Sequence, residues 1–139
     1  MKSISTALQR LGWNRRVLTY EDFEQFCERE GVLLYDLPPS RWRGFYTVHR
    51  DTHVIALDRR LHGWQRALVA WHEIAHYLHD HPGWFGHHAK TELQADIIAH
   101  VAILPAHLLH LPDGELNEIH GYPLAVIAER CRIFRAFNL

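Results

Sequence analysis

The sequence predicts an α+β fold, in which a small three-stranded sheet packs on one long helix and further helices surround the pair. Three observations predict it. Apolar residues recur three and four positions apart at both ends of the chain, a spacing that is typical of helices. Alternating apolar residues, typical of strands, occur only between residues 32 and 58. A helical pattern follows at 65–79, and a sheet of three strands needs such a helix against one face.

The first half of the chain is expected to contain two helices and all three strands. Thr19 is a typical helix N-cap, Glu21 and Asp22 suit a first helical turn, and Gly31 is a typical helix end. The expected elements are a helix within 1–13, a helix from Thr19 to Gly31, a strand at 32–35, a loop at 36–40, and a hairpin with strands 44–49 and 53–58 around a bend at 50–52.

The second half is expected to be helical, with glycine and proline marking the ends of its elements. These elements are a helix at 65–79 ended by residues 81–83, a loop at 84–88, a helix at 91–104 closed by Pro105, a helical turn at 106–109, a short helix at 115–120, a turn at 121–123 and an amphipathic helix at 124–137. We expect one domain over residues 1–139, because 139 residues with 47% hydrophobic content are enough for a single core.

The helix expected at 65–79 carries His72-Glu73-Ile74-Ala75-His76, the pattern HExxH. Histidines four positions apart share one helix face, so both can reach one metal ion, and the glutamate between them can act on a water molecule. Because the chain has 13 histidines, the pattern alone is only a hypothesis, and the alternative is a helix whose partly exposed histidines bind nothing. The core stripe of this helix leaves both histidines at its edge; the stripe is Trp71, Ile74, Ala75 and Leu78.

Two acidic residues on the helix expected at 91–104 complete the candidate site. Glu92 follows His76 by sixteen residues and offers a third metal ligand. Asp96 lies one helical turn further along and could hold His72 in its metal-binding orientation; the alternative is an ordinary aspartate on a helix surface. Ala95 and Ala99 share this face, and their small side chains allow the two helices to approach closely.

The composition argues against two classes of partner. A formal net charge of −1 provides no overall attraction to nucleic acid or to a membrane. No run reaches the roughly 18 apolar residues of a membrane span, and residues 1–13 lack the apolar run of a signal peptide, so we expect a cytoplasmic protein. Cys27 and Cys131 match no metal or redox spacing and are expected to be reduced, mostly buried thiols.

Two segments of the chain resemble the signatures of the ImmA/IrrE metallopeptidases. Residues 66–79, which contain HExxH, resemble that family's zinc helix, and residues 92–105 resemble its second signature. The positions in register are Glu92, Ala95, Asp96, Ala99 and Pro105; the departures are Ile98, His100 and Ala102, none of them an expected ligand. The resemblance extends more weakly over the hairpin and residues 124–134. It implies a minimal single-domain member with a zincin-like fold.

The resemblance implies a zinc-dependent endopeptidase. His72, His76 and Glu92 would hold Zn²⁺ and leave one position for water, while Glu73 would take a proton from that water and pass it to the leaving amine. Two imidazoles with one carboxylate favour zinc over manganese. The implied substrate is a partner transcriptional repressor of the helix-turn-helix type, in a stress, prophage or defence system.

Further side chains are candidates for stabilising the oxyanion or for binding the substrate. Donors for the oxyanion could be Tyr77, His79, His100 or the pair His87 and His88, and simple packing or exposure is the alternative for each. Peptidases often hold a substrate as an added strand on an open sheet edge. Because the strand at 53–58 directly precedes the zinc helix, that edge is expected to come from Val54, Ile55 and Ala56.

Two other classes of function are compatible with parts of the sequence. The chain could be a zinc-containing binding module that sequesters or senses a partner regulator without hydrolysis, but such a module would not need Glu73. It could also bind nucleic acid through Arg130, Arg132 and Arg135 of the last helix. Arginines on a final helix are more often a solvated face, and the net charge gives this interpretation no support.

Overall fold

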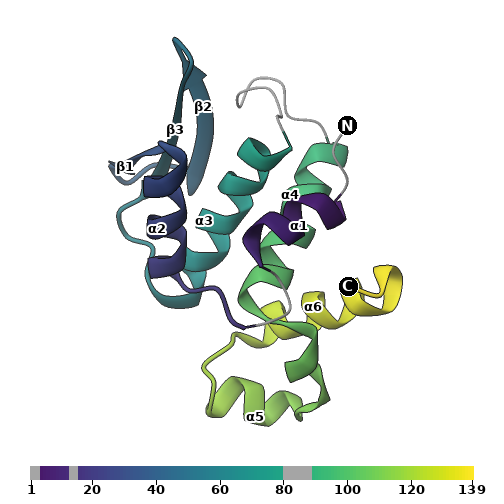
Figure 1. Cartoon of the computed structure of the whole chain (residues 1–139). Helices are drawn as coiled ribbons and strands as arrows, with labels where there is room; N and C mark the ends of the chain where they lie inside the picture. Colours follow the sequence, from purple (N-terminus) through teal and green to yellow (C-terminus); the bar gives the residue numbers. More distant parts are fainter. Residues whose placement is uncertain (1–3, 13–15, 80–88) are drawn as a thin grey trace.

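The computed structural model describes residues 4–12, 16–79 and 89–139, and it confirms the α+β prediction. A three-stranded sheet lies on one side of helix α3, and α4 lies on the other (Figure 1). The elements are α1 (Ile4–Leu11), α2 (Tyr20–Glu30), β1 (Leu33–Leu37), β2 (Gly44–His49), β3 (Thr52–Asp58), α3 (Gly63–Leu78), α4 (Ala89–Ile103), a 3-10 helix (Ala106–His110), α5 (Asp113–Glu118) and α6 (Leu124–Phe137). The predicted end of the zinc helix at 81–83 and the loop at 84–88 fall outside the described residues.

Helix α2 begins and ends where its sequence predicts. The Thr19 side chain accepts a hydrogen bond from the backbone of Asp22, and the Asp22 side chain accepts one from the backbone of Thr19, which together form a capping box. At the other end Gly31 adopts a left-handed conformation with φ 75°, which a glycine reaches without steric cost. Local chemistry alone therefore fixes both ends.

The sheet order β1-β3-β2 makes β3 the central strand. It pairs in parallel with β1, where Ile55 lies opposite Leu34, and antiparallel with β2, where Ile55 lies opposite Tyr46. The prediction that residues 53–58 form an open edge is therefore wrong, because the backbone of β3 is paired on both sides. In the part of the chain that the structure describes, the edge strands of the sheet are β1 and β2. Pairing with Leu57 and Asp58 also extends β1 through residue 37, into the predicted loop.

One face of the sheet packs on α3, and β2 comes especially close to the helix at Gly44. The face toward α3 includes Tyr46, Ile55 and Leu57, all buried. A Cβ atom added at Gly44 would lie 2.9 Å from Cγ1 of Val69, a distance that real Cβ atoms do not adopt. Only a glycine fits here without a shift. The outward face is open, and Tyr35 on it is 58% exposed.

Helix α3 has the predicted core stripe. Trp71, Ile74, Ala75 and Leu78 are all buried, and the Trp71 indole N–H donates to the carbonyl of Leu18 at 3.2 Å. Along its other side runs α4, whose Ala95 and Ala99 are buried. Small side chains on α4 thus meet the helix that carries HExxH, as the sequence predicts.

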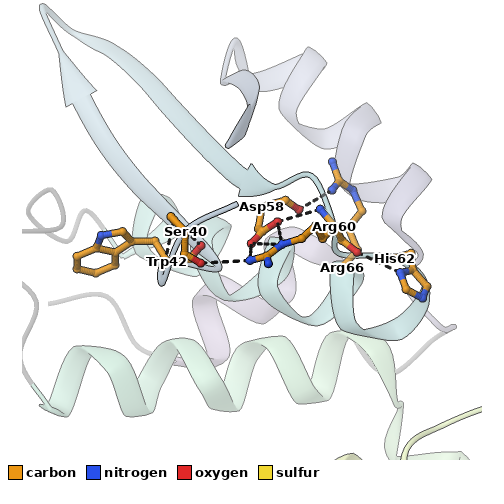
Figure 2. A network of polar contacts seen from close by, with 6 residues as sticks. All are labelled: Ser40, Trp42, Asp58, Arg60, His62 and Arg66. Carbon is orange, nitrogen blue, oxygen red and sulfur yellow. Dashed lines mark hydrogen bonds and ion pairs between the residues drawn. The ribbon is translucent and has the colours of Figure 1, made fainter. Parts of the chain in front are cut away.

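A polar network fixes the connection from β3 into α3 (Figure 2). Asp58, only 3% exposed, accepts hydrogen bonds from the backbone N–H of Arg60 at 2.9 Å and from its guanidinium at 2.6 Å. The Arg60 guanidinium also reaches the carbonyl of Ser40, and Arg66 reaches the carbonyl of Asp58 at 3.3 Å. These contacts tie the start of α3 to the end of the sheet.

The last helix does not present its three arginines to solvent together. Arg130 is fully buried, and its Nε donates to the carbonyl of Leu104 at 2.6 Å, just beyond the end of α4. Arg132 pairs with Glu129 of the same helix. The nucleic-acid interpretation therefore loses Arg130, since a side chain this deep cannot reach a phosphate. Both cysteines are free, with Cys27 buried and Cys131 half-buried. Within the described ranges, no helix is long and apolar enough to span a membrane.

Candidate metal centre

Three side chains from two helices converge beside the core. His72 and His76 come from α3, and Glu92 comes from the first turn of α4. The Glu92 carboxylate lies between the two rings, with Oε2 2.9 Å from Nε2 of His72 and Oε1 3.2 Å from Nε2 of His76. One nitrogen or oxygen from each residue lies within 4.8 Å of those of the other two. Three donor atoms thus surround one common point.

This donor set fits a zinc ion. Two imidazole nitrogens and a carboxylate oxygen are ligands that zinc takes in catalytic sites, at about 2.0–2.2 Å each. Ligands at such distances around a tetrahedral ion lie about 3.3–3.5 Å apart. The separations of 2.9 and 3.2 Å, each to a different oxygen of Glu92, lie slightly below that spacing.

Asp96 is placed to orient His72. Its Oδ1 accepts a hydrogen bond from Nδ1 of His72 at 2.7 Å, which leaves Nε2 directed at Glu92. Burial opposes a charge on this ring, but the hydrogen bonds to Asp96 and Glu92 outweigh it and raise the pKa of His72 to about 10. The acidic surroundings thus favour positive charge at this ring, which is the electrostatic setting that a cation needs.

Glu73 lies next to His72 in sequence, and its carboxyl group is buried within this site. Burial raises the pKa of Glu73 to about 7; the charge of His72 opposes the rise, and the carboxylates of Glu92 and Asp96 add to it. Its Oε2 has no hydrogen-bond partner among the described residues. A buried carboxyl group that titrates near neutrality, with one oxygen available, can accept a proton and return it.

A hollow of about 240 Å³ lies beside His72, between the start of β2, α3 and α4. Its lining combines groups of the site with residues that the sequence reasoning missed. The missed residues are Arg43, Gly44, Leu68 and Val69. Helical spacing could have identified Leu68 and Val69, which precede His72 by four and three positions. No local pattern marks Arg43.

Tyr77 and His100 are engaged with other neighbours. The Tyr77 hydroxyl donates to Glu30 of α2 at 3.2 Å, and its ring packs edge-on against His53, 4.9 Å between centroids. Nδ1 of His100 donates to the carbonyl of Asp96 in its own helix at 2.8 Å, and burial lowers the pKa of His100. The structure thus turns Tyr77 toward α2 and the sheet, and it holds His100 one turn along α4 from Asp96.

The remaining predicted residues separate into three groups. Ile55 and Ala56 are buried and Val54 is half-buried, all in the central strand rather than at an edge. His79 is buried at the end of α3. His87 and His88 lie outside the described residues.

A comparison with known protein families shows a match over most of the chain. The model of the IrrE N-terminal-like domain, Peptidase_M78, matches residues 27–133, which is 107 of 139 residues. The matched segment begins inside α2 and ends inside α6, so it includes the sheet and every side chain of the candidate centre. A comparison with curated proteins found no match.

Proposed function

We propose that this chain, which belongs to the Peptidase_M78 family and has a metallopeptidase-type role, is a zinc-dependent endopeptidase. One observation carries the proposal. Two imidazoles and one carboxylate meet at a common point, and a buried carboxyl group follows the first imidazole in sequence. A site that only bound a metal would need the three ligands but not Glu73.

In this proposal His72, His76 and Glu92 hold the zinc ion, and Asp96 keeps His72 in the orientation that binds it. When bound, the ion would polarise the scissile carbonyl and lower the pKa of a water molecule. Glu73 takes a proton from that water as its oxygen adds to the carbonyl carbon. The carbon–nitrogen bond then breaks, and Glu73 returns the proton to the leaving amine. The products are a carboxylic acid and an amine, which ionise to a carboxylate and an ammonium, and Glu73 is regenerated.

The substrate is proposed to bind as an added strand on the edge of β2. This edge replaces the predicted edge at 53–58. One edge of β2 has no partner strand among residues 4–12, 16–79 and 89–139, and Gly44 at its start lines the hollow beside His72. An extended peptide on this edge would pass the candidate centre, with main-chain hydrogen bonds holding its backbone. β3 cannot do this, because both of its edges are occupied.

The proposed substrate is a transcriptional repressor with a helix-turn-helix domain, as the resemblance to ImmA/IrrE peptidases implies. Family membership supports a protein substrate and the resemblance supports the repressor class. We also propose that residues 1–139 form one domain.

The test compares the wild-type protein with Glu73→Gln, both loaded with zinc and incubated with the helix-turn-helix protein encoded nearest to this one. Wild type should release two fragments, whose ends mass spectrometry identifies. The variant should bind zinc as tightly and cleave at least about 10²-fold more slowly, because it lacks the proton acceptor. Equal cleavage by both would remove Glu73 from the mechanism. Complex formation without cleavage by either would favour the binding module.

A further inference from the structure

The hollow beside His72 contains one charged group that the proposed mechanism does not use. Arg43 lies in the connection just before β2, and its exposed side chain lines the hollow. Its backbone carbonyl accepts a hydrogen bond from Asp58, which fixes the main chain at this point. Within residues 4–12, 16–79 and 89–139, the guanidinium of Arg43 makes no hydrogen bond or ion pair.

The two carboxylates that line the hollow have roles in the proposed mechanism. Asp96 accepts the hydrogen bond from His72 at 2.7 Å, and Glu73 is the proposed proton acceptor. Apart from Glu73, Arg43 is therefore the charged side chain of the hollow that has no partner among the described residues, and its charge is positive. An unpaired cation beside a binding site favours an anionic group on the ligand.

Part of the wall of the hollow is aliphatic. Leu68 and Val69 come from the turn of α3 that precedes His72, and Gly44 contributes no side chain opposite them. The hollow, with a volume of about 240 Å³, has room for one side chain of a bound peptide. A side chain with an aliphatic stem and a charged end would place its stem against these walls and its end at Arg43.

We propose that this hollow is a side-chain subsite of the peptidase and that Arg43 selects a glutamate of the substrate, next to the bond that is cleaved. The inference rests on the proposed function, since it needs a peptide on the edge of β2. The glutamate methylenes contact Leu68 and Val69, and its carboxylate pairs with the guanidinium of Arg43. The matching amide, glutamine, fills the same space without the charge.

The first test profiles cleavage of a proteome-derived peptide mixture by the zinc-loaded protein. Wild type should prefer glutamate to glutamine at one position beside the cleaved bond by about two- to fivefold, as expected for an exposed ion pair. Arg43→Gln should abolish this preference, and Arg43→Glu should reverse it in favour of lysine. Arg41→Glu is the matched control: it makes the same charge change two residues away, where Arg41 lies over the Trp42 ring, and should keep the wild-type preference. Circular dichroism verifies that each variant is folded.

The second test needs no hydrolysis. Zinc-loaded Glu73→Gln is titrated with fluorescein-labelled alanine octapeptides that carry one central glutamate, glutamine or lysine, and binding is read by anisotropy. The glutamate peptide should bind most tightly, and adding Arg43→Glu should remove that advantage. Cleavage without any acidic preference would overturn the inference and leave the proposed function standing. If the protein cleaved no peptide but still bound the glutamate peptide most tightly, the proposed peptidase function would be overturned and the subsite would stand. Equal affinity for all three peptides, or none, would overturn the subsite.

Discussion

The contact of Asp96 with His72 bears directly on the proposed metal site, although Asp96 is not among the proposed ligands. Its carboxylate holds Nδ1 of His72 at 2.7 Å and so determines which ring nitrogen faces Glu92. Without this hydrogen bond the ring of His72 could rotate. Fixing its orientation would then reduce the net free energy of metal binding. Its role is therefore measurable as zinc affinity.

Asp96→Ala is expected to lower zinc affinity by about 10- to 100-fold, the usual cost of losing such a partner. Competition with a chromogenic chelator measures it. Asp96→Asn should lose less zinc affinity than Asp96→Ala, because its amide oxygen can still accept the hydrogen bond from His72. Asp113→Ala, at the exposed start of α5, removes the same charge far from HExxH in sequence and should bind zinc like wild type. An unchanged affinity in Asp96→Ala would show that His72 needs no orienting partner.

The cluster of His72, His76 and Glu92 could be predicted because helical spacing decides most of it. Positions 72 and 76 share a face on any helix. The small side chains at Ala95 and Ala99 indicate that another helix packs closely against their face. Arg43 could not be predicted, because it lies in an irregular connection where no period relates it to the site. Its position beside His72 follows from the packing of β2 on α3, which brings residues far apart in sequence together.

At the scale of elements, the approach of β2 to α3 depends on a missing side chain. Gly44 leaves room for Val69, and the same approach brings the open edge of β2 beside the candidate centre. Any Cβ at this position would push the strand from the helix or force Val69 out of place.

Gly44→Ala is expected to reduce the free energy of unfolding by about 1–3 kcal/mol, the typical cost of overpacking. Urea denaturation measures the loss. Gly114→Ala in α5, where an added Cβ meets nothing within 4 Å, is the control and should not destabilise. In a Val69→Ala background the change at Gly44 should cost less, since its nearest obstacle is gone. The same cost in both backgrounds would contradict the proposed contact.

Elements with local signals could be predicted, whereas their pairing could not. Thr19, Asp22 and Gly31 mark the ends of α2 by chemistry within a few residues. The order of strands depends on contacts between distant segments: β1 pairs in parallel with β3, and the hairpin partner β2 goes to the opposite edge. Alternation of apolar residues in 53–58 is compatible with either a central or an edge strand. For this reason the pattern does not reveal that residues 53–58 form the central strand.

At the scale of the whole molecule, the network around Asp58 joins the sheet to the helical part (Figure 2). Hydrogen bonds from the Arg60 side chain and backbone lower the pKa of Asp58 from 3.8 to about 2. The folded state therefore binds a proton at Asp58 less readily than the unfolded chain. This contribution to stability is complete above pH 3.8 and is lost as pH falls through about 2.

Asp58→Asn is expected to unfold at lower denaturant concentration than wild type at pH 6, because it lacks the charged acceptor for Arg60. The difference should shrink as the pH falls from about 4 to about 2, as Asp58 itself becomes protonated in the wild type. Chemical denaturation across this range measures the trend. Asp51→Asn in the exposed hairpin turn is the control and should resemble wild type at pH 6. A difference that stays constant down to pH 2 would show that the charge of Asp58 is not what stabilises the fold.

The buried guanidinium of Arg130 has a consequence for the other end of the molecule. It caps the chain where α4 finishes, and α4 begins with the carboxylate that faces the two imidazoles. A protein shortened before α6 would keep every residue of HExxH, yet its second helix would lose its anchor at the far end. Such a fragment would retain the HExxH pattern, but it would hold Glu92, the third proposed ligand, only loosely.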